Sequence, residues 1–123
     1  MNLVDSCGWL EYFADTELAN FYAPALEDSE NLIVPTICIM EVFKKILLQK
    51  DESNAFHAIA LMQQGNVIDL DAILSMRAAK LGVVHNLPLA DSIIYATAQA
   101  YEAIVWTQDS DFKDLSGVKY KEV

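Results

Sequence analysis

Basic residues, cysteines and long apolar runs are all scarce in this sequence of 123 residues. There are 8 basic side chains against 18 acids, so the formal net charge is −10. This balance lacks the basic footprint of most nucleic-acid-binding surfaces. The two cysteines, Cys7 and Cys38, form neither a disulfide framework nor a zinc motif, because no CxxC spacing occurs. We expect both to be buried, reduced thiols.

Several classes of protein are excluded by what is missing. No stretch approaches the ~18 consecutive apolar residues that a membrane span needs. The segment Met1–Asp5 has no basic region followed by an apolar run, so it does not resemble a signal peptide. We therefore expect a cytoplasmic protein with no membrane partner. The motifs GxSxG, GxGxxG and the P-loop are also absent, which removes support for a serine hydrolase or a nucleotide cradle.

Short apolar runs alternate with segments of helical periodicity, and apolar residues make up 54% of the chain. With no linker, repeat or break in composition, one domain covering residues 1–123 is predicted. Strands are expected at 3–4, 32–35, 67–70, 103–107 and, at an edge, 118–120. Helices are expected at 7–13 with Ser6 as N-cap, 21–26, 36–50 with Thr36 as N-cap, 53–63, from the Asp71 cap to a stop at Gly82, and 89–101. This alternation indicates an α/β fold with a mainly parallel sheet.

Three acids follow predicted strands directly. Asp5 comes after the first strand, and Asp109 lies two residues beyond Thr107, with Asp111 two residues further on. Ligands of parallel α/β sheets bind beyond the carboxyl ends of the strands. These acids therefore lie where such a sheet presents its ligands.

Two more acids lie on predicted helices. Glu41 is close to the apolar face of its helix, where a carboxylate is rarely stable without a partner. Asp91 is in the first turn of its helix, where the helix dipole stabilises a carboxylate. Each acid alone has an ordinary explanation as a turn, cap or first-turn residue, and for Asp111 that explanation is preferred. Taken jointly, the set favours a site. The histidines His57, within a helix, and His85, in a loop, do not form a pair.

Four segments resemble the PIN-domain family, and in particular the VapC-like toxins of bacterial toxin–antitoxin pairs. They are Leu3–Ser6, Ile39–Val42, Leu89–Ala98 and Trp106–Phe112, in the family's order and over nearly the whole chain. The resemblance implies a Rossmann-like α/β/α sandwich with helices on both faces of the sheet. It also implies a Mg²⁺- or Mn²⁺-dependent endoribonuclease that forms homodimers and is inhibited by a small antitoxin encoded nearby.

Carried over residue by residue, the resemblance gives Asp5, Glu41, Asp91 and Asp109 as catalytic, metal-binding acids. Ser6, Thr107 and Asp111 are supporting residues. Cys7 departs from the family pattern, where a small polar residue is more usual. Hard divalent cations prefer carboxylate oxygens, and a bound cation offsets the mutual repulsion of clustered acids. Asp5, Asp91 and Asp109 are expected to contact the metal, and Glu41 to position water.

Two other functions remain open. The chain could be a PIN-fold binding module or scaffold with weak catalysis, although four retained acids argue against this. It could also be a receiver-type phosphotransfer domain, but that class needs adjacent acids after the first strand, where this chain has Ser6 and Cys7. For the antitoxin, aromatic residues of the first two helices are expected to provide a groove, with about half of them in the core; they are Trp9, Tyr12, Phe13, Phe21 and Tyr22. The acidic chain favours a partly basic partner segment.

Overall fold

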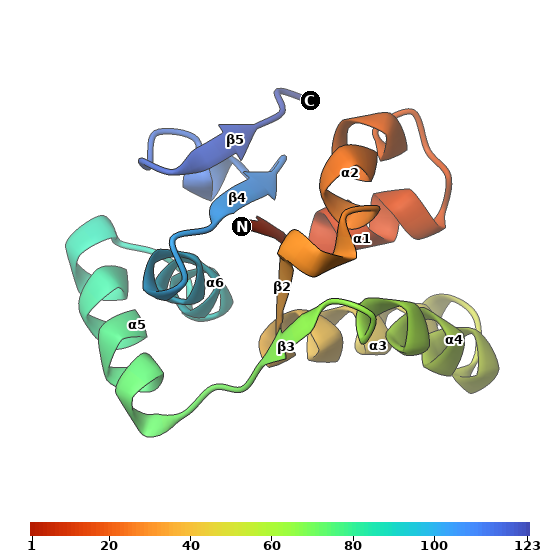
Figure 1. Cartoon of the computed structure of the whole chain (residues 1–123), viewed down its shortest axis with the longest axis horizontal. Coiled ribbons are helices and arrows are strands. Elements are labelled where there is room, and N and C mark those ends of the chain that lie inside the picture. The colour runs from red at the N-terminus through yellow and green to blue at the C-terminus, as the bar shows by residue number, and fades with distance from the viewer.

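Five parallel strands form the centre of the computed structural model, which describes the whole chain, Met1–Val123 (Figure 1). Their order in the sheet is β3-β2-β1-β4-β5. The strands are β1 (Asn2–Val4), β2 (Leu32–Pro35), β3 (Asn66–Ile68), β4 (Ile104–Thr107) and β5 (Val118–Tyr120). Every neighbouring pair is parallel. The predicted α/β fold is confirmed, and β5 is an edge strand as expected.

Six helices connect these strands. They are α1 (Ser6–Phe13), α2 (Ala19–Leu26), α3 (Thr36–Gln49), α4 (Glu52–Met62), α5 (Ala72–His85) and α6 (Leu89–Ala100), with two short 3₁₀ turns, η1 (Ser29–Asn31) and η2 (Ser110–Phe112). Figure 1 shows α5 and α6 on one side of the sheet and α1 to α4 on the other. This is the expected three-layer arrangement, because right-handed crossovers change face when the direction of travel along the sheet reverses. No helix is both long and apolar enough to cross a membrane.

The core lies where apolar strands meet apolar helix faces. Leu3, Val34 and Val105 are completely buried in the three central strands. Cys38, Val42 and Ile46 recur every fourth residue along α3 and bury one face of that helix against the same cluster. Such recurrence is the pattern of an amphipathic helix packed on a sheet. The central strands are therefore held in place on both faces, which fixes the position of the residues at their carboxyl ends.

Two helix starts differ from the prediction. Asp5, not Ser6, is the N-cap of α1, and its side chain accepts a hydrogen bond from the Ser6 amide. Pro35, not Thr36, precedes α3 as its N-cap and offers no side-chain hydrogen bond. In both cases the segment directly continues a strand, so the last extended residue is itself the cap.

The predicted end of α5 at Gly82 is wrong. The helix continues to His85, which was expected in a loop, and it ends at Asn86, whose φ of 54° is left-handed. Gly82 is helical because α5 and α6 approach closely there. A Cβ atom at Gly82 would lie 3.2 Å from the Ser92 Cβ, so glycine allows this contact and Asn86 supplies the left-handed residue that ends a helix.

Candidate metal centre

The centre of the sheet is also the point where its strand order reverses. From β1 the chain passes first to β2 on one side and later to β4 on the other. Ligands of open α/β sheets bind at such a point, beyond the carboxyl ends of the strands. Asp5 follows β1 directly, and Asp109 follows β4 by two residues. Since β1 and β4 are hydrogen-bonded neighbours, the sheet itself brings the two acids together.

Asp5 is held rigidly although it is almost completely buried. Its Oδ1 accepts a hydrogen bond of 2.7 Å from the Ser6 amide, and its Oδ2 accepts one of 2.8 Å from the Thr107 hydroxyl. Its own amide donates to the Trp106 carbonyl at 3.0 Å. The Asp5 carboxylate is thereby fixed to the start of α1 and to the end of β4, which limits its choice of rotamers.

Asp109 is positioned by the same threonine. Its amide donates to the Thr107 Oγ1 at 2.9 Å, and its Oδ1 accepts a hydrogen bond of 3.0 Å from the Asp111 amide. Thr107 is fully buried, so its hydroxyl connects Asp5 to the turn that carries Asp109. Thr107 is thus hydrogen-bonded to two of the predicted site residues, Asp5 and Asp109. Asp111 is exposed and contributes its backbone to the turn.

Asp91 and Glu41 reach the site from helices. Asp91 is in the first turn of α6 and is only 9% exposed. Glu41 is half-buried on α3, and its Oε1 accepts a hydrogen bond of 3.1 Å from the Ser6 hydroxyl. Ser6 also lies 3.4 Å from the Asp5 Oδ1. Ser6 therefore links the two acids Asp5 and Glu41, which are 36 residues apart in the sequence.

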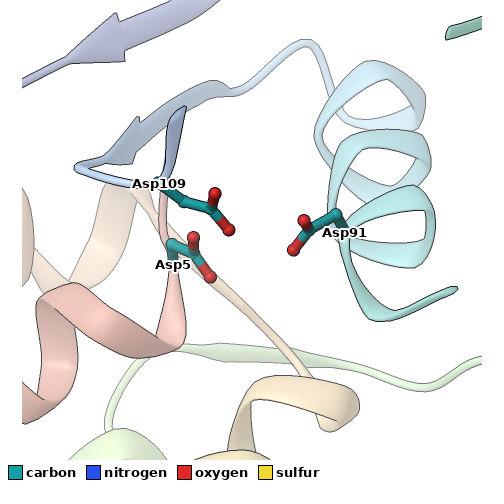
Figure 2. A group of neighbouring side chains, drawn as sticks. All are labelled: Asp5, Asp91 and Asp109. Carbon is teal, nitrogen blue, oxygen red and sulfur yellow. The ribbon is translucent and has the colours of Figure 1, made fainter. Parts of the chain in front are cut away.

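Three of the four predicted acids meet at one point. The side chains of Asp5, Asp91 and Asp109 point toward one another from the end of β1, from α6 and from the turn after β4 (Figure 2). One carboxylate oxygen from each lies within 4.8 Å of the other two. Glu41 stands outside this group of three and joins it through Ser6. The only ion pair of the protein is Lys113–Glu122, so no basic side chain neutralises the cluster.

The pKa values of three site acids, Asp5, Glu41 and Asp91, are raised above those of free side chains. Burial, followed by the negative charges of Asp109 and Asp5, raises the pKa of Asp91 to about 8. Burial also raises the pKa of Asp5, against the opposing hydrogen bonds from Thr107 and Ser6. The pKa of Glu41 is raised in the same direction, again mainly by burial. All three shifts mean that the folded protein, without a counter-charge, disfavours the ionised site.

Sequence reasoning did not identify a second layer of contacts behind the acids. The buried Tyr22 of α2 donates a hydrogen bond of 2.8 Å to the Gln108 Oε1, in the segment between Thr107 and Asp109. The Cys7 Sγ lies 3.7 Å from the Thr107 hydroxyl. Burial raises the pKa of Cys7 to about 12, so this thiol is not a nucleophile. Only the position of Gln108 between two site residues could have been noticed in the sequence.

The donor set fits a hard divalent cation. It consists of carboxylate oxygens without nitrogen or sulfur ligands, which suits Mg²⁺ and Mn²⁺ rather than softer metals. A cation at the cluster would favour the ionised carboxylates, against the burial and the mutual repulsion that raise these pKa values.

The fold and the site define an α/β protein with an acidic centre where the strand order of its sheet reverses. Comparison with known proteins agrees with this description. The model of the PIN domain matches residues 3–118. The chain therefore belongs to the PIN-domain family. No match is found among curated proteins.

Solved structures show the same fold. A toxin–antitoxin complex from Klebsiella pneumoniae is similar with a TM-score of 0.84 and 25% identity, over 100% of both chains. The Mycobacterium tuberculosis toxin VapC20, described as cleaving the sarcin–ricin loop, has a TM-score of 0.78 and 15% identity, over 100% of this chain and 98% of that one. DNA-bound VapBC from Salmonella typhimurium has a TM-score of 0.74 and 13% identity, over 98% of each chain.

Proposed function

We propose that this protein is a metal-dependent endoribonuclease and the toxin of a toxin–antitoxin pair. The observation that carries the proposal is the convergence of Asp5, Asp91 and Asp109 at the switch point, with no basic side chain to neutralise them. The similarity to VapC and VapBC structures supports the biological setting. A binding module would have no need for three buried or half-buried acids without a basic partner.

Each residue of the centre has a distinct role in this proposal. Asp5, Asp91 and Asp109 supply the oxygen ligands for Mg²⁺ or Mn²⁺. When bound, the cation supplies an acidified water and offsets the charge that develops on the phosphate oxygens. Glu41, held by Ser6, orients the attacking water and accepts its proton; burial raises the pKa of Glu41, which makes its carboxylate a stronger base. Thr107 holds Asp5 and the Asp109 turn in register.

The antitoxin is proposed to occupy a hollow between α1, α3 and α4. It has a volume of about 180 Å³ and an apolar floor that includes Leu10, Phe13 and Ile46, with Lys50 and His57 also among its lining residues. The expected aromatic groove is thus only partly present. Trp9 and Tyr22 are buried in the core, and Tyr12, Phe13 and Phe21 are partly buried. Of the five, only Phe13 lines the hollow.

A homodimer is proposed through the outer face of α5. Met76 and Val83, seven residues apart, are 62% and 84% exposed, and Ile73 and Val84 are also exposed. Such a patch on a helix is unusual for an isolated protein. The 14 residues of α5 contain no acid, so contact through this helix adds little repulsion between two copies of an acidic chain. Met76→Glu with Val83→Glu should convert the dimer into a monomer in sedimentation experiments.

The decisive test is cleavage of RNA by the purified protein with Mg²⁺ or Mn²⁺, followed by addition of EDTA. We expect internal cleavage that stops when the metal is removed. Cleavage that continues in EDTA would contradict the proposed mechanism. RNA that is bound but never cut, at any metal concentration, would instead support the binding-module alternative.

A further inference from the structure

Arg77 and Lys80 carry the positive charges of α5 and, like Lys44, Lys45, Lys50 and Lys121, form no ion pair. They lie almost one turn apart on α5, a helix that contains no acid. Elsewhere Lys113 pairs with Glu122 at 3.4 Å, and Lys119 stacks on the Trp106 ring at 4.1 Å. Neither Arg77 nor Lys80 forms an ion pair. These two residues are therefore a free pair of positive charges on a chain with net charge −10.

Both side chains line one hollow between α5 and α6. Its other lining residues are Leu81 of α5 and Ala96 and Gln99 of α6, and its volume is about 340 Å³. Ala96 is almost completely buried and has only a methyl side chain, which leaves space between the two helices. The polar groups around this space are a guanidinium, an ammonium and an amide. All three can donate hydrogen bonds and no carboxylate faces them, which is the chemistry of an anion site.

The hollow is connected to the metal centre by α6, which lies beside α5 in Figure 1. Asp91 is in the first turn of this helix and Gln99 near its end. Eight residues of α-helix rise about 12 Å, a distance that a short length of nucleic-acid backbone can span.

We propose that Arg77, Lys80 and Gln99 form a phosphodiester-binding site for the RNA backbone, at a distance from the scissile bond. The inference rests on the proposed ribonuclease function and assigns it a substrate contact. With a net charge of −10, the chain as a whole repels RNA. A pair of free basic side chains provides local attraction, and arginine gives a phosphate two parallel hydrogen bonds. The same chemistry would accept free inorganic phosphate, which binds without the additional contacts of a strand.

The test compares two double variants that remove the same two positive charges. Arg77→Gln/Lys80→Gln changes the proposed site, and Lys44→Gln/Lys121→Gln, at two exposed lysines without an ion pair, is the matched control. Binding of a short labelled single-stranded RNA is measured by fluorescence anisotropy over a range of salt, in an Asp5→Asn background that prevents cleavage. We expect the site variant to bind about tenfold more weakly. Its salt dependence should be shallower by about 0.7 in the log–log slope, the effect of one phosphate contact on a single strand.

The control should retain the slope, and the conservative pair Arg77→Lys/Lys80→Arg should restore most of the affinity. In the cleaving protein, the site variant should raise KM and leave kcat unchanged. Equal losses in the site and control variants would overturn the proposal, because they would report overall charge alone. Competition by inorganic phosphate that is as effective as unlabelled RNA would also overturn it. If the wild-type protein binds RNA through Arg77 and Lys80 but never cuts it, the ribonuclease function fails and the binding site stands.

Discussion

The aspartates that cap helices fall into two environments. Asp51 and Asp71 cap α4 and α5, are exposed, and accept hydrogen bonds of 2.8 Å from the Asn54 and Leu74 amides. Asp5 also caps a helix, α1, but accepts from the amide of the next residue, Ser6, and is buried next to Asp91 and Asp109. Hydrogen bonds from Asn54 lower the pKa of Asp51, whereas burial raises that of Asp5. Being a helix cap therefore does not separate an exposed acid from one in the candidate metal centre; the neighbouring acids do.

The largest expected effect is on catalysis. Asp5→Ala, Glu41→Ala, Asp91→Ala and Asp109→Ala should each reduce RNA cleavage by roughly a hundredfold or more, since ligands and proton acceptors act together on the transition state. Asp111→Ala should be milder, because its backbone makes the turn contact. Asp28→Ala, in an exposed turn, is the control and should be fully active. The assay is cleavage at matched metal and salt concentrations, and full activity of Glu41→Ala would contradict its assigned role.

Stability should change in opposite directions at the two kinds of aspartate. Asp91→Asn removes a charge that the folded protein disfavours, so it should stabilise the metal-free protein by on the order of 2 kcal/mol near pH 8. Asp71→Ala removes a favourable cap and should destabilise it by about 1 kcal/mol. Urea unfolding without metal measures both. Destabilisation by Asp91→Asn would show that its carboxylate has a structural partner after all.

The pH dependence of stability follows from Asp91. Its pKa is about 8 in the folded protein and about 3.9 in an unfolded chain. Between these values the folded state binds the additional proton, so the free energy of unfolding of the metal-free protein should fall as the pH rises from about 4 to about 8. The raised pKa values of Asp5 and Glu41 act in the same direction.

Melting temperatures measured without metal at about pH 5 and about pH 8 test this expectation. The melting temperature should decrease less between these pH values for Asp91→Asn than for the wild type. A metal-free wild type that is more stable at the higher pH would contradict the raised pKa of Asp91. Because protons and metal compete for the same oxygens, Mn²⁺ affinity should rise over the same pH range.

The smallest expected effect is that of removing the Ser6 hydroxyl, which links Asp5 to Glu41. Ser6→Ala removes the hydroxyl that lies between Asp5 and Glu41 but leaves the backbone hydrogen bond to Asp5 in place. Cleavage should fall about tenfold, the scale of one charge-assisted hydrogen bond, while Mn²⁺ affinity should hardly change. Kinetics and metal titration on the same preparation separate these effects. An equal loss of cleavage rate and of Mn²⁺ affinity would indicate that Ser6 and Glu41 help to bind the metal.

Much of the fold and part of the candidate site were predictable from the sequence. Apolar runs and helical periodicity located all five strands and six helices, and the rule for parallel sheets selected Asp5 and Asp109. The end of α5 was not predictable in this way, because Gly82 serves the close approach to Ser92 in another helix. The contacts of Tyr22 with Gln108 and of Ser6 with Glu41 depend on tertiary packing. Local sequence patterns carry no information about such partners.

The central claim is that Asp5, Asp91 and Asp109 hold a divalent cation. The most direct measurement is the melting temperature of wild type, Asp91→Asn and Asp71→Ala over a range of Mn²⁺ concentrations. A cation bound only by the folded state stabilises it by about 2.7 kcal/mol at a hundredfold excess over Kd. The melting temperature of wild type and of Asp71→Ala should therefore rise by the same amount, and that of Asp91→Asn should hardly rise. A wild-type curve that does not move across millimolar Mn²⁺, or an equal rise in all three proteins, would contradict the claim.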